Sequence, residues 1–201
     1  MPDPGSPSRG HARRADAERN ARLLLAAARG LFDEHGPDVA MDEVARRAGV
    51  GNATLYRNFP TRSDLLAAVY ADEVAALCQQ GTALLARPCA GEALFDWLDS
   101  FVVHVAAKRA LALAATAGSD EQRSELFASW HESMRSTAGK LLARAQQAGA
   151  IHPDLTVTDL LALASAAALA GASADHARQL LEIMRHGIAP QQDVPPQQPG
   201  G

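Results

Sequence analysis

The sequence is poor in the residues on which disulfide and metal frameworks depend. It holds only two cysteines, Cys78 and Cys89, among 201 residues, and neither belongs to a His or Cys spacing that would bind a metal ion. This scarcity argues against a disulfide-stapled secreted domain and is typical of a reducing compartment. We therefore predict no metal site and no cofactor, and interpret both cysteines as small hydrophobic residues.

Long apolar runs and strand patterns are missing as well. No segment reaches the roughly 18 unbroken apolar residues of a membrane span, and the N-terminus lacks a hydrophobic signal core. No run combines strict alternation with many β-branched residues, and aromatic residues make up only 4% of the chain. These absences predict a soluble, cytoplasmic, all-α protein that has no membrane partner and whose helices pack closely through Ala and Leu.

Motifs of the common enzyme classes are also absent. The chain has no Gly-rich phosphate loop and no serine at a strand–helix elbow. Scattered Ser, His and Asp residues are expected by chance in a helical protein. We expect no catalytic residues, and keep a helical enzyme only as an alternative from a different functional class.

Charge is distributed unevenly along the chain. Residues 1–62 contain ten Arg, no Lys and eight acidic residues, a net charge of +2. Residues 63–201 contain nine basic and fifteen acidic residues, a net charge of −6. A basic head on an acidic body is typical of a small nucleic-acid-binding module attached to a second domain.

Composition and helical periodicity divide the chain into four parts. Residues 1–14 and 190–201 are rich in Pro, Gly and polar residues and are predicted to be disordered. A small head follows at 15–61, and a larger body at 62–189. The predicted helices cover 15–35, 41–48, 52–59, 62–86, 91–109, 119–148, 156–171 and 173–188. The residues that cap the last three are Ser119, Thr156 and Ser173.

The spacing of residues 44–59 predicts a helix-turn-helix. Ala45 is small enough for a second helix to approach closely. Gly49 permits the left-handed backbone conformation that a tight turn after a helix requires. The residues that close the shared core are Val44, Val50, Leu55 and Phe59.

The outward face of the third predicted helix is rich in hydrogen-bonding groups. Its Thr, Tyr, Arg and Asn side chains offer donors and acceptors to phosphates and base edges, and Ala53 leaves room for a methyl-sized contact. Gly51 and Asn52 open the helix, so we expect its positive dipole end to point towards DNA. Double-stranded DNA is therefore the predicted partner. The candidate contacts are Asn52, Ala53, Thr54, Tyr56, Arg57 and Asn58.

These residues lie within a segment, 22–66, that resembles the DNA-binding head of the TetR family of bacterial transcriptional regulators. The most specific part is AGVGNATLYRNFPTRSDLL at 48–66. It is close to the family pattern of Gly-Val, a small residue, Thr-Leu-Tyr, a basic residue, Phe-Pro, then a basic residue and Leu. Residues 91–115, GEALFDWLDSFVVHVAAKRALALAA, resemble a subgroup common in actinobacteria. The resemblance implies a helical homodimer in which each chain has a three-helix head and a ligand-sensing, dimer-forming body.

The resemblance also implies roles for single residues of the head. The residues that would face DNA are Thr54, Tyr56, Arg57 and Asn58. Tyr56 would contact a phosphate, and Arg62 occupies the family's usual basic position at the start of the fourth helix. The arginines of the N-terminal arm are either solvated or contact phosphates or a minor groove. These arm residues are Arg9, Arg13 and Arg14.

One position departs from the family pattern. The family commonly has Thr or Ser just before the second helix, where the hydroxyl caps the helix and touches a phosphate. Here the equivalent stretch, Val39-Ala40-Met41, carries no hydroxyl, and a missing cap costs ~1 kcal/mol. Arg46 and Arg47 are expected to recover part of the electrostatic attraction, which makes Arg46 a further DNA-binding candidate.

The last two predicted helices are the candidates for dimerisation. Twofold symmetry doubles the site that one head can read, and apolar stripes on these helices are expected to form a four-helix bundle with the second copy. The alternative is that these stripes face only the core of their own chain. The candidate dimer contacts are Leu160, Leu163, Ala167, Leu180, Leu181 and Met184.

Large side chains in the body are few and fall in two helical stripes. If the stripes face each other, they line an apolar cavity in which His104 is a polar group; the alternative is an ordinary core. The candidate ligand contacts are Trp97, Phe101, His104, Phe127, Trp130 and Met134.

Taken with the family resemblance, these features predict a homodimeric repressor that a small apolar or amphipathic effector releases from a palindromic operator. In the family, the ligand tilts the heads so that they no longer fit successive major grooves. Two alternatives stay open: a DNA-binding dimer without a small-molecule ligand, whose body serves assembly or contact with another protein, and the helical enzyme.

Overall fold

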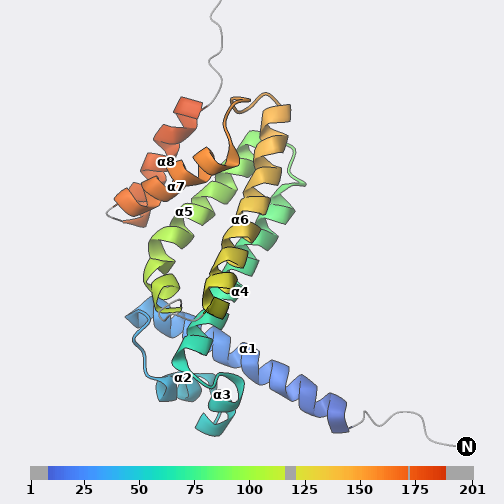
Figure 1. Cartoon of the computed structure of the whole chain (residues 1–201), viewed down its shortest axis with the longest axis vertical. Helices are drawn as coiled ribbons and strands as arrows, with labels where there is room; N and C mark the ends of the chain where they lie inside the picture. The colour runs from blue at the N-terminus through green and yellow to red at the C-terminus, as the bar shows by residue number, and fades with distance from the viewer. Residues whose placement is uncertain (1–8, 116–120, 172, 189–201) are drawn as a thin grey trace, which may run out of the picture. The chain divides into compact units, whose positions relative to one another are not determined.

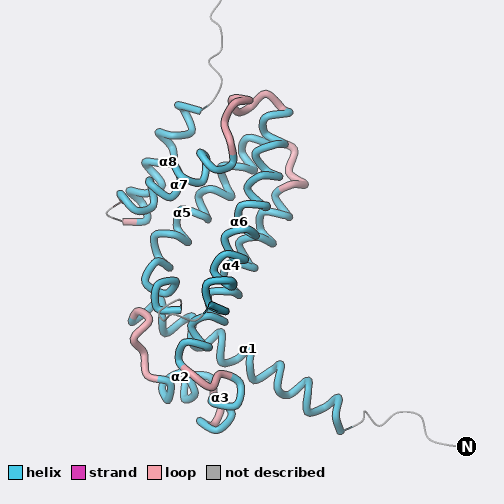
Figure 2. The backbone as a smooth tube through the Cα atoms, in the orientation of Figure 1, coloured by secondary structure: helices cyan, strands magenta, loops and turns pink. Residues whose placement is uncertain are grey.

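The computed structural model describes residues 9–115, 121–171 and 173–188. Within these ranges the chain forms eight helices and no strand, which confirms the predicted all-α fold (Figures 1 and 2). None of the described helices is both long enough and apolar enough to cross a membrane. The helices are α1 (Arg9–His35), α2 (Met41–Ala48), α3 (Asn52–Asn58), α4 (Arg62–Leu84), α5 (Ala90–Ala115), α6 (Glu121–Gln147), α7 (Val157–Ala170) and α8 (Ala174–Ile188).

The chain divides into two compact units. The first comprises residues 1–73 and 108–127, and the second comprises 74–107 and 128–201. The predicted boundary between head and body falls at the start of α4, whereas the first unit continues through three further turns of that helix. Within this unit, Arg29 of α1 pairs with Asp72 and, at 3.2 Å, with Glu73.

Helix α1 begins six residues before its predicted start. The prediction of a disordered arm is wrong for residues 9–14, which are helical, whereas residues 1–8 lie outside the described part of the chain. The segment that follows Pro7 is rich in Ala and Arg, which are strong helix formers. Residues 14–19 are exposed, and Leu24 is the first buried side chain in the part of α1 whose burial is described, from residue 14 onward. Residues 14–19 therefore extend beyond the packed part of the head.

The core of the head is built from one face of α1 together with α2 and α3, which all contact one another. The helix ends at His35, and Gly36, with φ +77°, turns the chain towards α2, as predicted. Side chains that are at most 8% exposed fill this core: Leu24, Ala28, Leu31, Phe32, Val44, Leu55 and Phe59.

The second unit is organised around Trp97 of α5, which is completely buried. Its indole Nε1 donates a hydrogen bond to the carbonyl oxygen of Leu77 at 3.0 Å, and its ring stacks on Phe101 with centroids 5.4 Å apart. A Cβ added to Gly81 would lie only 2.8 Å from this indole nitrogen and even closer to Thr137 of α6. Glycine is therefore required for α4 to pass so closely between α5 and α6.

Helices α7 and α8 pack together and begin with side-chain caps. The hydroxyl of Thr156 accepts a hydrogen bond from the amide of Asp159 at 3.2 Å, and that of Ser173 accepts one from the amide of His176 at 3.2 Å. Both predicted caps are confirmed. Ser119, the third predicted cap, lies outside the described residues, as does the tail from residue 189. Helix α5 continues to Ala115, beyond its predicted end at 109.

Two arginines of α8 fasten that helix to α5. Arg178 binds the carboxylate of Asp99 at 3.0 Å. Arg185 pairs with Glu92, and its guanidinium lies 5.0 Å above the ring of Phe95. These contacts combine charge, hydrogen bonding and cation–π attraction, and they fix which face of α8 is turned towards its own chain.

Candidate nucleic-acid interface

The turn between α2 and α3 has the geometry of a helix-turn-helix. Gly49 adopts φ +68°, and the amide of Val50 donates to the carbonyl oxygen of Ala45 at 3.1 Å. Ala45 is 1% exposed and Leu55 is fully buried, so the two helices meet through a closed apolar contact. The predicted roles of the small residue, the glycine and the inward leucine are confirmed.

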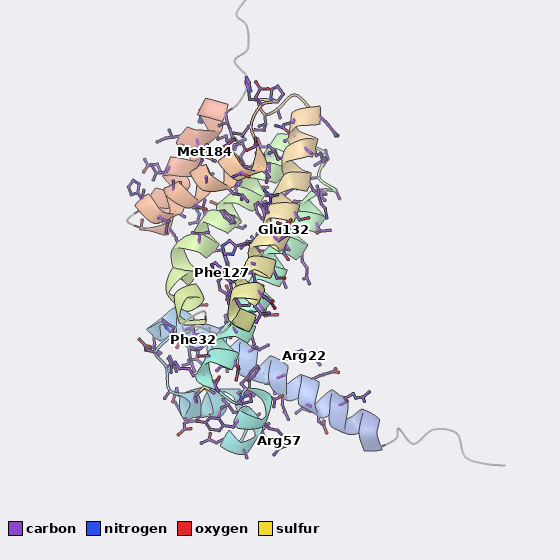
Figure 3. All side chains as sticks on the ribbon, in the orientation of Figure 1. Arg22, Phe32, Arg57, Phe127, Glu132 and Met184 are labelled. Carbon is purple, nitrogen blue, oxygen red and sulfur yellow. The ribbon has the colours of Figure 1, made fainter. Side chains whose placement is uncertain are left out.

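Helix α3 turns its polar residues outward, as Figure 3 shows for Arg57, which lies away from the core residue Phe32. Tyr56 is 47% exposed. Within the described part of the chain, Arg57 has no hydrogen-bond or ion-pair partner, so its five donors are available to a ligand. Asn52 and Ala53 are exposed, whereas Thr54 and Asn58 are half-buried.

Two asparagines of α3 already bind protein groups. Asn52 donates to the carboxylate of Asp42 at 3.0 Å, which joins the first turn of α3 to the first turn of α2. Asn58 donates to the carbonyl oxygen of Thr54 at 2.8 Å, one turn back along its own helix. Their side-chain oxygens are not used by these bonds. The exposed pair Tyr56 and Arg57 is therefore the most available part of the predicted surface.

The arginines of α2 are paired with carboxylates. Arg46 donates to Glu43 at 3.0 Å, and Arg47 donates to Glu34 of α1 at 2.7 Å. These hydrogen bonds hold the pKa of both the Glu43 and the Glu34 carboxyl below its usual value. The carboxylates stay ionised at neutral pH and offset the charge that Arg46 was expected to present to DNA.

The start of α2 has no side-chain cap, as the sequence predicts. Ala40 stands at the capping position in an extended conformation and supplies no side-chain hydrogen bond. Asp42 and Glu43 lie in the first turn, where negative charge interacts favourably with the helix dipole. These two acids compensate part of the missing cap, but unlike a hydroxyl they repel a phosphate.

The guanidinium of Arg62 is bound by groups of its own chain. It donates to the carbonyl oxygens of Val39, at 2.6 Å, and Pro37, and lies 3.5 Å from the carboxylate of Asp38. Arg62 is therefore engaged within its own chain, and its predicted contact with DNA stays a prediction. The sequence pattern did not reveal these intramolecular contacts, because the residues are more than twenty positions apart.

The predicted ligand residues lie mostly in the second unit. Trp97 and Phe101 are in direct contact, and His104, Trp130 and Met134 are 4–9% exposed. Phe127 is half-buried and belongs to the first unit. Among the described side chains, no three His, Cys, Asp or Glu residues come together where they could hold a metal ion.

The structure separates the predicted dimer residues into two sets. Leu160, Ala167 and Leu181 are at most 9% exposed and pack inside their own chain. They have little or no surface left to lose to a second copy, which makes them weaker candidates for the interface than the exposed residues of these helices; the interface itself stays a prediction. Leu163 is 46% exposed, and Leu180 and Met184 are half-buried.

Two exposed residues of these helices were missed by the prediction. Leu169 is 52% exposed and Ile183 is 66% exposed. On α7 the exposed apolar residues recur at helical spacing on the side opposite the buried stripe: Ala162, Leu163, Ala166, Leu169 and Ala170. This second stripe was visible in the sequence, but an Ala- and Leu-rich helix does not reveal which of its two apolar sides faces its own core.

Known proteins resemble both parts of the chain. A profile of bacterial regulatory proteins of the tetR family matches residues 24–69, and a profile of the SbtR-like transcriptional regulator C-terminal domain matches residues 89–190. An HTH-type transcriptional regulator of Staphylococcus aureus is 42% identical over 53 residues. The match covers 26% of this chain and spans only 29% of the length of that curated relative.

Solved structures extend the likeness over nearly the whole chain. The TetR transcriptional regulator SCO0520 from Streptomyces coelicolor is 36% identical with a TM-score of 0.72, over 86% of this chain and 99% of that one. A TetR regulatory protein from Mycobacterium vanbaalenii is 34% identical with a TM-score of 0.71, over 88% and 98%. A regulator from Saccharomonospora viridis, solved in complex with choline, shares the fold at 21% identity and a TM-score of 0.68, over 87% and 100%.

Proteins of this kind are transcriptional regulators that bind DNA as dimers, and not enzymes. The enzyme alternative is thereby excluded. The closed helix-turn-helix, the outward polar face of α3 and the matches over both units lead to one conclusion: the chain belongs to the TetR family of bacterial transcriptional regulators.

Proposed function

We propose that the protein is a homodimeric repressor that reads a palindromic operator with α3 and leaves it when a small apolar or amphipathic effector binds the body. The observation that carries the DNA-binding part is the outer face of α3. There Tyr56 is 47% exposed and Arg57 is free of intramolecular ion pairs within the described residues. An aromatic hydroxyl and a guanidinium supply the phosphate and base-edge contacts that position a recognition helix.

Selection of binding sites from random duplex DNA tests this proposal. The native protein is expected to enrich an inverted repeat with half-sites about one helical turn apart, because a twofold dimer presents two copies of α3. Tyr56→Ala is expected to lose that enrichment while remaining folded, since the residue is exposed. Binding that falls steeply with salt and enriches no sequence would reduce the interaction to phosphate attraction and contradict the proposal.

The exposed apolar stripe of α7 is the proposed dimer surface. Leu163→Glu is expected to raise the dimer dissociation constant roughly 100-fold or more, because each dimer would bury two unpaired charges and each costs several kcal/mol. Sedimentation velocity over a range of protein concentrations measures this change. Leu126→Glu on α6 is the matched control, since Leu126 is 42% exposed and Leu163 46% exposed. Equal behaviour of the two variants would place the interface elsewhere.

Effector binding is supported by the composition of the second unit's interior. Trp97, Phe101 and Met134 supply apolar surface, and His104 and Thr137 are buried polar residues of the same unit. A ligand can displace the protein from DNA only if it binds the free form more tightly than the DNA-bound form. Thermal-shift screening of amphipathic metabolites, with choline among the probes, followed by titration of the free and operator-bound protein, measures this difference. Equal affinities would leave a DNA-binding dimer without effector control.

A further inference from the structure

Arg62 joins the start of α4 to the turn that precedes α2. One guanidinium nitrogen, Nη1, donates to the carbonyl oxygen of Val39 at 2.6 Å, and the other, Nη2, donates to that of Pro37. The carboxylate of Asp38 lies 3.5 Å from Nη2. All three partners belong to the five-residue turn between α1 and α2, so a single side chain contacts two carbonyl groups and the one carboxylate of this turn.

The turn depends on this side chain because its own sequence offers little else. Helix α1 ends at His35, and Gly36, which follows it, has a left-handed backbone conformation. Helix α2 begins after Ala40, which supplies no side-chain cap. The carbonyl groups of Pro37 and Val39 precede the first turn of α2 and do not belong to a helix. An arginine fork presents two donors in a fixed plane and can satisfy both carbonyl groups at once, which a lysine ammonium cannot do with the same geometry.

The other end of this connection is also held firmly. Thr61 and Asp64 form a reciprocal cap at the start of α4: the amide of Thr61 donates to the Asp64 carboxylate at 2.9 Å, and the amide of Asp64 donates to the Thr61 hydroxyl at 3.2 Å. Leu65 and Leu66, on the next turn, are 1% and 2% exposed. The start of α4, from which Arg62 projects, is therefore fixed within the head. Through Arg62, the turn before α2 is attached to this fixed position.

We propose that Arg62 is a positioning residue for operator recognition: it sets the placement of α2, and through the α2–α3 turn that of α3, instead of binding a DNA phosphate. This inference rests on the proposed DNA-binding function. The link to α3 is direct, because α2 and α3 contact each other, bury Ala45 and Leu55, and are joined by the hydrogen bond that Asn52 donates to Asp42. Loss of Arg62 would leave both helices intact but less precisely placed for a groove.

The experiment compares Arg62→Gln, Arg62→Lys and Thr61→Ala in the full chain. Affinity is measured over a series of KCl concentrations for the selected operator and for a scrambled duplex of equal length. Arg62→Gln is expected to weaken operator binding roughly 10- to 100-fold, the effect of one or two lost base contacts, with scrambled-duplex affinity and salt slope unchanged. Arg62→Lys is expected to resemble Arg62→Gln, because charge alone does not restore the fork.

A phosphate contact predicts the opposite pattern. Arg62→Lys would then bind almost like the native protein. Arg62→Gln would weaken both duplexes and reduce the log–log salt slope by about 1.8 for a dimer, since each phosphate contact contributes about 0.9. Either result would overturn the proposal.

Amide hydrogen exchange of the free variants provides a readout that does not need an operator. Arg62→Gln is expected to accelerate exchange selectively between Gly36 and Ala45, whereas Thr61→Ala, which removes a cap of α4, is expected to spare that segment. Exchange that rises evenly over the head, or a drop in operator preference of equal size in Thr61→Ala, would show that Arg62 contributes only to general stability. Failure of the native protein to select any operator would refute the proposed function. The hydrogen-exchange result would then still show whether Arg62 holds the turn between α1 and α2.

Discussion

Arg57→Gln is expected to bind the selected operator roughly 30-fold or more weakly than the native protein, because a contact worth about 1–3 kcal/mol would be lost twice in each dimer. The guanidinium is exposed and has no intramolecular hydrogen bond or ion pair among the described residues. It therefore has no structural task that the substitution would disturb. The free energy of unfolding is expected to change by no more than about 0.5 kcal/mol, the usual range for surface positions. Fluorescence anisotropy with a labelled operator, together with a thermal melt, measures both quantities.

Lys140→Gln is the matched control for this variant. It removes the same single positive charge from an exposed position on α6, outside the head. Its operator affinity is expected to stay within about twofold of native, because Lys140 belongs to the second unit and not to the helix-turn-helix that is proposed to contact DNA. If both variants weakened binding equally, Arg57 would act only through net charge, and the assignment of α3 as the recognition helix would lose its main support.

Trp97→Ala is expected to cost about 3–5 kcal/mol of stability, the range for large aromatic deletions in a core. The side chain is completely buried, stacks on Phe101 and donates a hydrogen bond to the carbonyl oxygen of Leu77. The substitution removes the packing and leaves that acceptor without its partner. For a chain of this size the melting temperature is expected to fall by roughly 6–20 °C, as measured by circular dichroism or calorimetry.

Two variants separate the contributions of Trp97. Trp97→Phe keeps an aromatic ring beside Phe101 but loses the indole N–H, so its cost is expected to lie between those of native and Trp97→Ala. Leu126→Ala, at a position 42% exposed, is expected to change stability by less than about 0.5 kcal/mol. If Trp97→Ala left the free energy of unfolding almost unchanged, Trp97 would not be an essential part of the packed core. That result would favour its assignment to an effector-binding cavity.

Features that depend on local chain geometry were readable from the sequence. Gly49 after α2 and the caps Thr156 and Ser173 adopt the predicted conformations, because the constraint in each case acts between residues at most a few positions apart. The same holds for the missing cap at Ala40. The pair Leu55 and Phe59, four residues apart, is buried as predicted, since helical periodicity alone sets which side they share.

Features that depend on distant partners were not readable. Arg62 and Arg47 look alike in a sequence as basic residues of a DNA-binding head, yet Arg62 binds the turn before α2 and Arg47 pairs with Glu34 of α1, thirteen positions away. On α7, Leu160 and Leu163 are three residues apart in an almost wholly apolar helix. The packing of α7 against its own chain buries the first and leaves the second 46% exposed.

The sequence by itself determined that the protein is all-α, where most of its helices begin and end, and which short helix carries an outward polar face. These properties follow from periodicity, glycine and capping chemistry, which act over one or two helical turns. Only the tertiary structure decided which arginines remain available to a ligand and which apolar stripe of α7 is left for a partner. The physical reason is that a hydrogen-bond donor or an apolar surface that is already used inside the chain cannot also bind a partner. A guanidinium that donates to Pro37 and Val39, or a leucine that packs in its own core, is no longer available elsewhere, and that choice is made between residues far apart in the chain.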